Sequence, residues 1–246
     1  MRRELSPEKR RAADRMAVFL ARQIRDGELV FHGVASALPM TAVGIARRLH
    51  APNLIYLNIP GGVDARPARL PGSTVGVQLL EGARAHFNLI EIFDLSARGA
   101  LDLAFLGGAQ IDGRGDINLS YIGDPKRPKV RLPGGAGSAC ILPTAKRTVL
   151  WRTAHDPRSF PERCAWVTAS GKVDRVITPL CIFRKEAGRL RIESRHAGVA
   201  PETVREATGF DPGPCEEVFE TPEPTPEEAA ALQAADPEGV RFLEFA

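Results

Sequence analysis

Residues 28–62 read ELVFHGVASALPMTAVGIARRLHAPNLIYLNIPGG, and this stretch decides the fold. Its two ends, residues 28–33 and 53–59, are short apolar runs of the kind that form buried strands. Residues 39–50 between them carry apolar side chains at helical spacing, and Pro52 closes that segment. A strand, a helix and a second strand in this order predict two parallel strands joined by a right-handed crossover.

Helices and strands alternate on both sides of this unit. Upstream, Ser6 and Pro7 have the pattern of a capping residue and first turn for a helix that stops at Gly27. Downstream, apolar periodicity predicts helices over residues 75–84 and 89–97. The further predicted strands are residues 101–106, 149–151, 166–168, 180–183 and 190–194, the last two joined through Ala187-Gly188. This pattern predicts an α/β protein with a single open, mainly parallel sheet flanked by helices.

We predict one α/β domain over residues 1–212 and a C-terminal arm over residues 213–246. A chain of 246 residues can bury one substantial core, which argues against two equal domains. The arm is rich in proline and glutamate, and Thr225 and Glu228 have the spacing of a capping box. One short helix is therefore expected in the arm, and the chain has no internal repeat.

The composition excludes several classes of function. The net charge of +3 is small and the arginines are scattered, which disfavours a nucleic-acid interface. No apolar run is long enough to cross a membrane, and the basic N-terminus lacks the apolar core of a signal peptide. We therefore expect a cytoplasmic protein that binds neither nucleic acid nor membrane. The four cysteines lack the spacing of zinc ligands, so no metal site is expected: Cys140, Cys164, Cys181 and Cys215.

The first candidate binding loop directly follows the strand predicted at residues 101–106. It consists of Gly107, Gly108, Ala109 and Gln110. Glycines allow backbone N–H groups to approach a ligand closely, and ligands of open α/β sheets lie beyond the carboxyl ends of strands. The alternative interpretation is a tight turn followed by a hairpin at Asp112-Gly113.

The second candidate loop consists of Gly134, Gly135, Ala136, Gly137 and Ser138. The amides of such small residues suit an anion nest or an oxyanion site. The loop does not match the dinucleotide fingerprint, because no helix is predicted to open from it, and it lacks the lysine of a phosphate-binding P-loop. Both of those common functions are disfavoured.

Together these segments resemble the B subunit of glutaconate CoA-transferase, a family I CoA-transferase, over nearly the whole chain. The matching stretches are ARQIRDGELV (21–30), ALPMTAVGIARRLHAPN (37–53), FLGGAQIDGRGDINLSYIGD (105–124), the GGAGSA loop and VAPETVREATGFD (199–211). The resemblance implies an open α/β fold and an A-type (alpha) partner subunit in an α2β2 heterotetramer. It also implies an active site at the interface of the two subunit types.

The resemblance extends to the residues that bind the substrate. It implies that the loops at 107–110 and 134–138 line the site of a coenzyme A thioester, and that Ser36 and Leu38 face this site from the crossover loop. Coenzyme A is then part of the acyl-CoA substrate. No tightly bound cofactor is expected.

Ile59 stands where the family carries its nucleophile. In the family's B subunit, a glutamate lies in an E-S-G motif after an A-P-x strand, and counting from Ala51-Pro52 places that glutamate at Ile59. The glutamate forms a mixed anhydride and then an enzyme–CoA thioester, which an isoleucine side chain cannot do. The family has its own aspartate at the position of Asp64, so Asp64 is no displaced nucleophile. The remaining candidates are interpreted as ordinary residues of helices: Glu81, Glu91, Asp94, His50 and His86.

The missing nucleophile favours non-transferase chemistry, such as decarboxylation of a glutaconyl-type thioester or hydrolytic ring opening. Such reactions need an oxyanion site, which the backbone amides of the glycine loops would supply. Asn58, beside Ile59, is the candidate donor to a substrate carboxylate or carbonyl; the alternative is a strand-end side chain satisfied by backbone. The other functions that stay open are a true CoA-transferase subunit, a non-catalytic scaffold subunit and, less well matched, a sugar-phosphate isomerase of related fold.

Overall fold

A computed structural model describes residues 5–246, which divide into two compact units. Unit 1 combines the described residues up to Phe105 with Pro224–Ala246, and unit 2 is Leu106–Glu223. The boundary that we predicted at residue 212 stays a prediction. The C-terminal residues from Pro224 onward, expected to form an arm, belong to unit 1.

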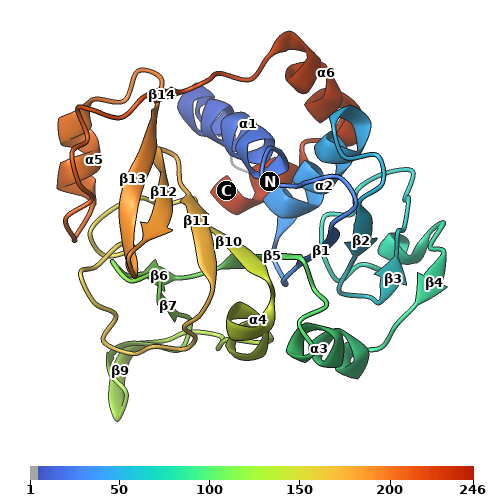
Figure 1. Ribbon diagram of the computed structural model, residues 1–246, viewed down its shortest axis with the longest axis horizontal. Coiled ribbons are helices and arrows are strands. Elements are labelled where there is room, and N and C mark those ends of the chain that lie inside the picture. The colour runs from blue at the N-terminus through green and yellow to red at the C-terminus, as the bar shows by residue number, and fades with distance from the viewer. Residues whose placement is uncertain (1–4) are drawn as a thin grey trace. The chain divides into compact units, whose positions relative to one another are not determined.

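Unit 1 contains the predicted crossover. Its elements are α1 (Pro7–Ala21), β1 (Leu29–His32), α2 (Ala37–Leu49), β2 (Ile55–Leu57), β3 (Gly62–Val63), η1 (Val77–Leu80), β4 (Ala85–His86), α3 (Leu89–Ala97), β5 (Leu103–Gly107), α6 (Pro226–Ala235) and η2 (Val240–Phe245). The strand order is β5-β1-β2-β3-β4 (Figure 1). Strand β1 runs parallel to both β2 and β5, whereas β3 is antiparallel to its two neighbours. The predicted β-α-β unit is confirmed.

The C-terminal helices complete the core of unit 1. Helix α6 and the 3-10 helix η2 pack against α1 and α2, and Figure 1 shows α6 beside α2. The Arg241 guanidinium, 6% exposed, donates from Nε to Asp14 over 2.6 Å and from Nη1 to Asp236 over 2.9 Å. The capping box predicted at Thr225 and Glu228 begins α6. These contacts tie residues far apart in sequence into one unit.

Unit 2 carries the second set of strands. Its elements are β6 (Gln110–Ile111), β7 (Ile117–Asn118), β8 (Tyr121–Asp124), β9 (Arg127–Arg131), α4 (Ser138–Thr144), β10 (Arg147–Trp151), β11 (Val173–Ile177), β12 (Cys181–Glu186), β13 (Arg189–His196), α5 (Pro201–Ala207) and β14 (Glu220–Thr221). The strand order is β14-β13-β12-β11-β10, with β10–β11 parallel and β12–β13 an antiparallel hairpin. Its turn residues Ala187 and Gly188 both have positive φ, as a tight hairpin turn requires.

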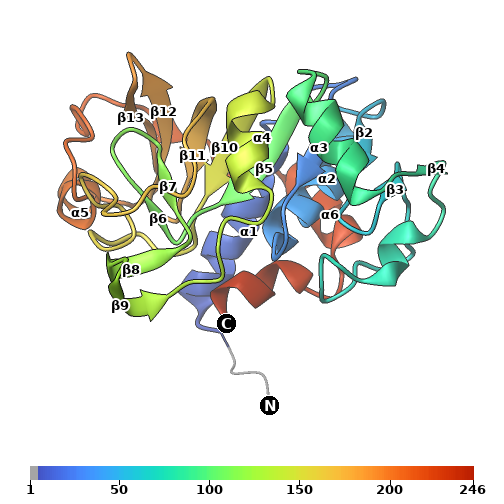
Figure 2. The same cartoon turned by 90° about the horizontal axis from the view of Figure 1, so that it is seen from below.

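Two small ribbons complete unit 2. Strands β6 and β7 form one antiparallel pair, and β8 and β9 form a second hairpin, visible at the edge of unit 2 in Figure 2. The α/β fold class, an open and mainly parallel sheet flanked by helices, is confirmed. No helix within residues 5–246 is both long enough and apolar enough to cross a membrane.

Two predicted elements do not form as expected, and one helix was not predicted. The helix expected over residues 75–84 is only the four-residue 3-10 helix η1, because Glu81 is extended and Gly82 has φ +64°. Residues 166–168 form no strand, although neighbouring Ala169 makes an isolated bridge to Ile117. A helix that we did not predict, α4, begins at Ser138 directly after the second glycine loop.

Candidate functional site

The two glycine loops of unit 2 are attached to consecutive residues of one segment. The backbone N–H of Ala109 donates to the Asn118 carbonyl over 3.1 Å, and that of Gly134 donates to the Leu119 carbonyl over 2.7 Å. The Leu119 N–H in turn donates to the Thr168 hydroxyl over 2.8 Å. The loops, which lie more than twenty residues apart in sequence, are thereby attached to the same short segment of unit 2.

The first loop is shaped by close packing around Gly108. A Cβ atom at Gly108 would lie 3.0 Å from the Gln110 carbonyl oxygen and 3.0 Å from Ile111 Cγ1. At Gly107 it would lie 3.6 Å from Trp151, which is an ordinary contact. A methyl group would therefore be tightly crowded at Gly108 but not at Gly107.

The side chain of Gln110 supports this loop. Its Nε2 donates to the Arg158 carbonyl over 2.8 Å, and its Oε1 accepts from Asn118 Nδ2 over 2.8 Å. Asn118 is fully buried and also donates to the Tyr121 carbonyl. The Gln110 amide thus holds the loop in place. The predicted role of residues 107–110 in binding stays a prediction.

The second loop adopts conformations that small residues allow. Gly134 has φ +100° and Ala136 has φ +43°, both in the left-handed region. At Gly135 a Cβ atom would lie only 2.6 Å from Thr168 Cγ2. Any side chain at this position would therefore displace Thr168, whose hydroxyl accepts from the Leu119 N–H. Gly137 then precedes α4 as its N-cap, without a side-chain capping bond. The loop presents backbone N–H groups rather than ionisable side chains.

Asp112 fixes the turn that follows the first loop. It is fully buried, its Oδ1 accepts from the backbone N–H groups of Arg114 and Asp116, and its Oδ2 accepts from that of Cys164 over 3.0 Å. The hairpin expected at Asp112-Gly113 forms between β6 and β7. The turn at Asp112-Gly113 therefore has a structural role, whether or not the preceding loop binds a ligand.

Three of the four cysteines of unit 2 are poor nucleophiles. Burial, with a further contribution from Asp112 and Asp116, raises the pKa of the Cys164 thiol to about 12. Burial also raises the pKa of the Cys181 and Cys215 thiols. These three groups stay protonated at neutral pH, which removes them as activated thiolates. Among residues 5–246, no cluster of three or more His, Cys, Asp or Glu side chains is placed to hold a metal ion.

In unit 1, Ile59 lies in a tight turn at the end of β2. The Gly61 N–H donates to the Asn58 carbonyl over 3.0 Å, and Gly61 has φ +97°. A Cβ atom at Gly61 would lie 2.1 Å from the Phe87 carbonyl oxygen, so the turn requires glycine there. Ile59 itself is half-buried. The turn positions an aliphatic side chain where the resemblance places a carboxylate.

Both polar atoms of the Asn58 side chain are engaged by backbone. The residue is fully buried, Nδ2 donates to the Leu79 carbonyl over 2.7 Å, and Oδ1 accepts from the Gly62 N–H over 2.8 Å. This geometry favours the strand-end interpretation over the catalytic one. The catalytic role of Asn58 stays a prediction.

Asp64 is held by arginines. It is 5% exposed with φ +54°, contacts the Arg47 guanidinium, and lies within 3.6 Å of Arg66 and 3.7 Å of Arg84. A carboxylate paired with several guanidinium groups in this way is part of the local structure.

The remaining ionisable candidates have structural surroundings. Glu91 completes the capping box of α3, and Asp94 pairs with Arg98 on its exposed face. His50 caps the C-terminus of α2 as expected. Two placements were wrong: Glu81 follows η1 in extended backbone, and His86 lies in β4 rather than at a helix edge.

A buried polar pair at the end of β1 was missed in the sequence. His32 is fully buried, with Nε2 2.5 Å from the Tyr56 hydroxyl and Nδ1 2.9 Å from the Gly33 carbonyl. Burial lowers the pKa of His32 to about 4 and raises that of Tyr56, so both are neutral at pH 7. The signal available in sequence was a histidine and a tyrosine in two strands predicted to be adjacent.

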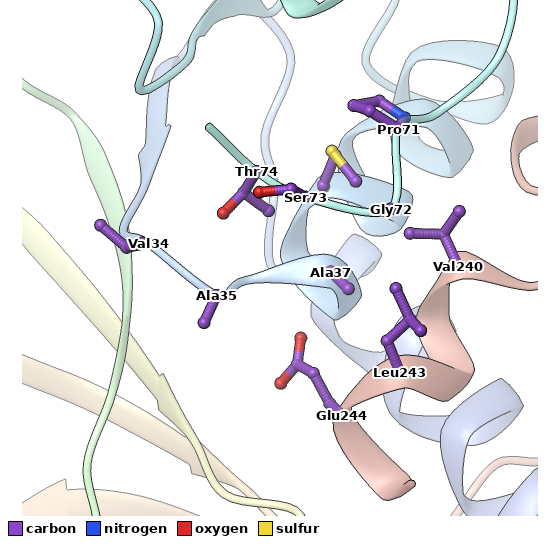
Figure 3. Close-up of a pocket in the computed structure, with 11 residues that line it drawn as sticks. Val34, Ala35, Ala37, Pro71, Gly72, Ser73, Thr74, Val240, Leu243 and Glu244 are labelled. Atoms are coloured by element: carbon purple, nitrogen blue, oxygen red, sulfur yellow. The ribbon is translucent and has the colours of Figure 1, made fainter. Parts of the chain in front are cut away.

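A pocket of about 330 Å³ opens in unit 1 beside the start of α2 (Figure 3). Segments 34–37 and 71–74 form two of its sides, and Met40, η2 residues and Glu244 complete it. Ser36 and Leu38 are both fully buried and do not line it, whereas Ala35 and Ala37 do. Leu38 lies inside α2 and not on a crossover loop as expected. Their role as substrate-pocket residues stays a prediction.

These features define an open α/β protein with glycine-rich loops and tight turns beside its strands. The chain belongs to the coenzyme A transferase family, whose model matches residues 13–207. It is 34% identical over 241 residues to the B subunit of 3-oxoadipate CoA-transferase from Pseudomonas knackmussii, covering 90% of this chain and 91% of that protein. It is 28% identical over 219 residues to the B subunit of glutaconate CoA-transferase from Acidaminococcus fermentans, covering 79% and 81%.

The fold is also similar to that in the crystal structure of the decarboxylase AibA/AibB. The TM-score is 0.88 at 31% identity, with 94% of this chain and 97% of that chain covered. The resemblance to the glutaconate-type B subunit is thus confirmed at the level of the family. The relatives include both transferases and a decarboxylase.

Proposed function

We propose that this chain is the B-type subunit of a heteromeric enzyme that acts on the coenzyme A thioester of a mono- or dicarboxylic acid by non-transferase chemistry. The observation that carries the proposal is Ile59, at the position of the nucleophilic glutamate, with Asp64 nearby already paired to Arg47. The reaction class is decarboxylation of a glutaconyl-type thioester or hydrolysis such as ring opening. An A-type subunit in an α2β2 assembly completes the enzyme, and no cofactor is bound tightly.

The chemistry needs no covalent step from this chain. Loss of carbon dioxide from a glutaconyl-type thioester leaves its electron pair delocalised onto the thioester oxygen. Backbone N–H groups of the loops 107–110 and 134–138 are the donors that we assign to this oxygen, because they are fixed in place before the charge develops. The N–H groups of Ala109, Gly134 and Ser138 are not among them, since they donate to carbonyl groups of the protein. The 31% identity to a decarboxylase supports this assignment.

A true CoA-transferase subunit is the second candidate, favoured by the 34% identity to a 3-oxoadipate CoA-transferase subunit. Transfer in that case would need its carboxylate nucleophile from another position. The third candidate is a non-catalytic scaffold subunit. In that case, substitutions in the glycine loops should not change the activity of the complex.

The deciding experiment uses the chain purified together with its A-type partner. Glutaconyl-CoA is supplied with and without acetate, and carbon dioxide and acetyl-CoA are both measured. We expect carbon dioxide, or free acid from hydrolysis, at a rate that acetate does not change. Acetyl-CoA formation that hydroxylamine abolishes by trapping a carboxyl group of this chain would overturn the proposal in favour of transfer.

A further inference from the structure

The pocket beside α2 contains a polar atom that the described part of the chain leaves unsatisfied. Thr74 is 3% exposed, and its buried Oγ1 has no hydrogen-bond partner within residues 5–246. The residue lines the pocket, and Figure 3 shows its hydroxyl pointing into the space between segments 34–37 and 71–74. A buried hydroxyl without a partner destabilises the fold, and a hydrogen bond to a ligand would remove that penalty.

A carboxylate lies on the other side of the same space. Glu244 of η2 accepts from the Leu38 N–H over 2.7 Å, in the first turn of α2, where the helix dipole stabilises negative charge. Figure 3 shows this carboxylate directed toward Ala35 and Ala37. The pocket therefore presents a carboxylate acceptor at the helix end.

The rest of the lining is apolar. Ala37, Met40 and Val240 belong to one buried cluster, and Leu243 packs against it. The ligand that fits has an apolar body with one hydrogen-bond donor for Glu244 and one acceptor for Thr74. A secondary amide supplies both groups and carries no charge.

We propose that this pocket binds the pantetheine arm of the coenzyme A thioester, with an amide carbonyl accepting from Thr74 Oγ1 and an amide N–H donating to Glu244. The inference rests on the proposed function, since it takes the acyl-CoA substrate as given. It goes further by assigning the pocket to one part of that substrate, because the pantetheine arm contains secondary amides, whereas the phosphates and an acyl carboxylate do not.

The test measures dissociation constants on the intact complex by calorimetry, with coenzyme A, pantetheine and adenosine 3′,5′-bisphosphate as probes. Thr74→Val removes the hydroxyl at nearly constant shape, and Thr74→Ser retains it. Thr41→Val is the matched control, because Thr41 Oγ1 is also buried without a partner among the described residues but does not line the pocket. Thermal unfolding is recorded for every variant.

We expect Thr74→Val to weaken coenzyme A and pantetheine binding by about fivefold to tenfold, while adenosine 3′,5′-bisphosphate binding is unchanged. Thr74→Ser and Thr41→Val should stay within about twofold of the parent complex. Coenzyme A binding that is equally tight in Thr74→Val overturns the pantetheine assignment and leaves the proposed function standing. A folded complex that binds neither coenzyme A nor pantetheine overturns both.

Discussion

The side-chain amide of Asn58 donates to the carbonyl oxygen of Leu79 over 2.7 Å, which fastens the end of β2 to η1. The same side chain accepts from Gly62, so one buried residue fixes the turn that contains Ile59. The shape of this turn depends on Asn58 whether or not the residue touches a substrate.

Replacing Asn58 by alanine should lower the free energy of unfolding by about 2–3 kcal/mol, because it leaves two buried backbone groups unpaired. Denaturant unfolding measures the loss, and Gln78→Ala, at an exposed position of η1, is the control with an expected change below about 0.5 kcal/mol. If Asn58→Ala instead retains full stability and loses turnover, the residue is a substrate contact.

Placing a glutamate at Ile59 should create the nucleophile that the family uses. For Ile59→Glu we expect coenzyme A exchange into acetate that hydroxylamine inhibits, together with slower decarboxylation or hydrolysis. Ile59→Gln has a similar shape without a nucleophilic carboxylate and should show no exchange. Equal exchange in the parent enzyme would show that transfer does not depend on this position.

The two glycine loops should differ residue by residue in their tolerance of a methyl group. Gly108→Ala and Gly135→Ala introduce contacts of 3.0 Å and 2.6 Å, and we expect each to lower turnover by about tenfold or more. Gly107→Ala meets only an ordinary contact at 3.6 Å and should remain near the parent rate. Unchanged turnover in all three variants of an assembled complex would favour the scaffold function.

Acid should destabilise the protein through His32. Its pKa in the folded state is about 4, below the unfolded value of 6.5, so the unfolded chain binds more protons between these values. Stability therefore falls as the pH drops from 6.5 toward 4, by roughly 3 kcal/mol from this residue. His32→Gln should reduce this pH dependence in urea unfolding, whereas substitution of the exposed His86 should not. If the stability of His32→Gln depended on pH as strongly as that of the parent protein, His32 would not be the group responsible.

Replacing the buried Arg241 should lower the free energy of unfolding far more than replacing an exposed arginine. Arg241→Met leaves Asp236, 1% exposed, without its cation, and should lower the free energy of unfolding by about 3–5 kcal/mol. Arg69 pairs with Glu238 at the surface, and Arg69→Met should change the free energy of unfolding by less than about 1 kcal/mol. Equal losses in thermal or denaturant unfolding would show that the buried ion pair does not anchor η2.

Sequence patterns predicted the elements whose signals are local. The Ser6-Pro7 start of α1, the Thr225–Glu228 capping box and the Ala187-Gly188 hairpin all form, because each depends on a few adjacent residues. The prediction of a helix over residues 75–84 was wrong, because the apolar spacing there reflects the burial of Leu79 and not a continuous helix.

The site was predictable in part. The glycine loops and Ile59 stood out from residue type and spacing, whereas the Thr74 hydroxyl and the Glu244 carboxylate come together only through the packing of η2 on α2. These two residues are 170 positions apart, so no short motif contains both. Likewise, the His32–Tyr56 pair depends on strand register, which a single sequence does not specify.

The division of unit 1 between the two ends of the sequence has a consequence for biosynthesis. A ribosome makes α1 and α2 early but makes α6 and η2, which cover them, only after all of unit 2 has been synthesised. Unit 2 is one continuous stretch, so its internal contacts can form as soon as it leaves the exit tunnel. Nascent chains should therefore present an uncovered α1–α2 surface to chaperones until α6 and η2 have left the exit tunnel, and the contact of Arg241 with Asp14 forms late.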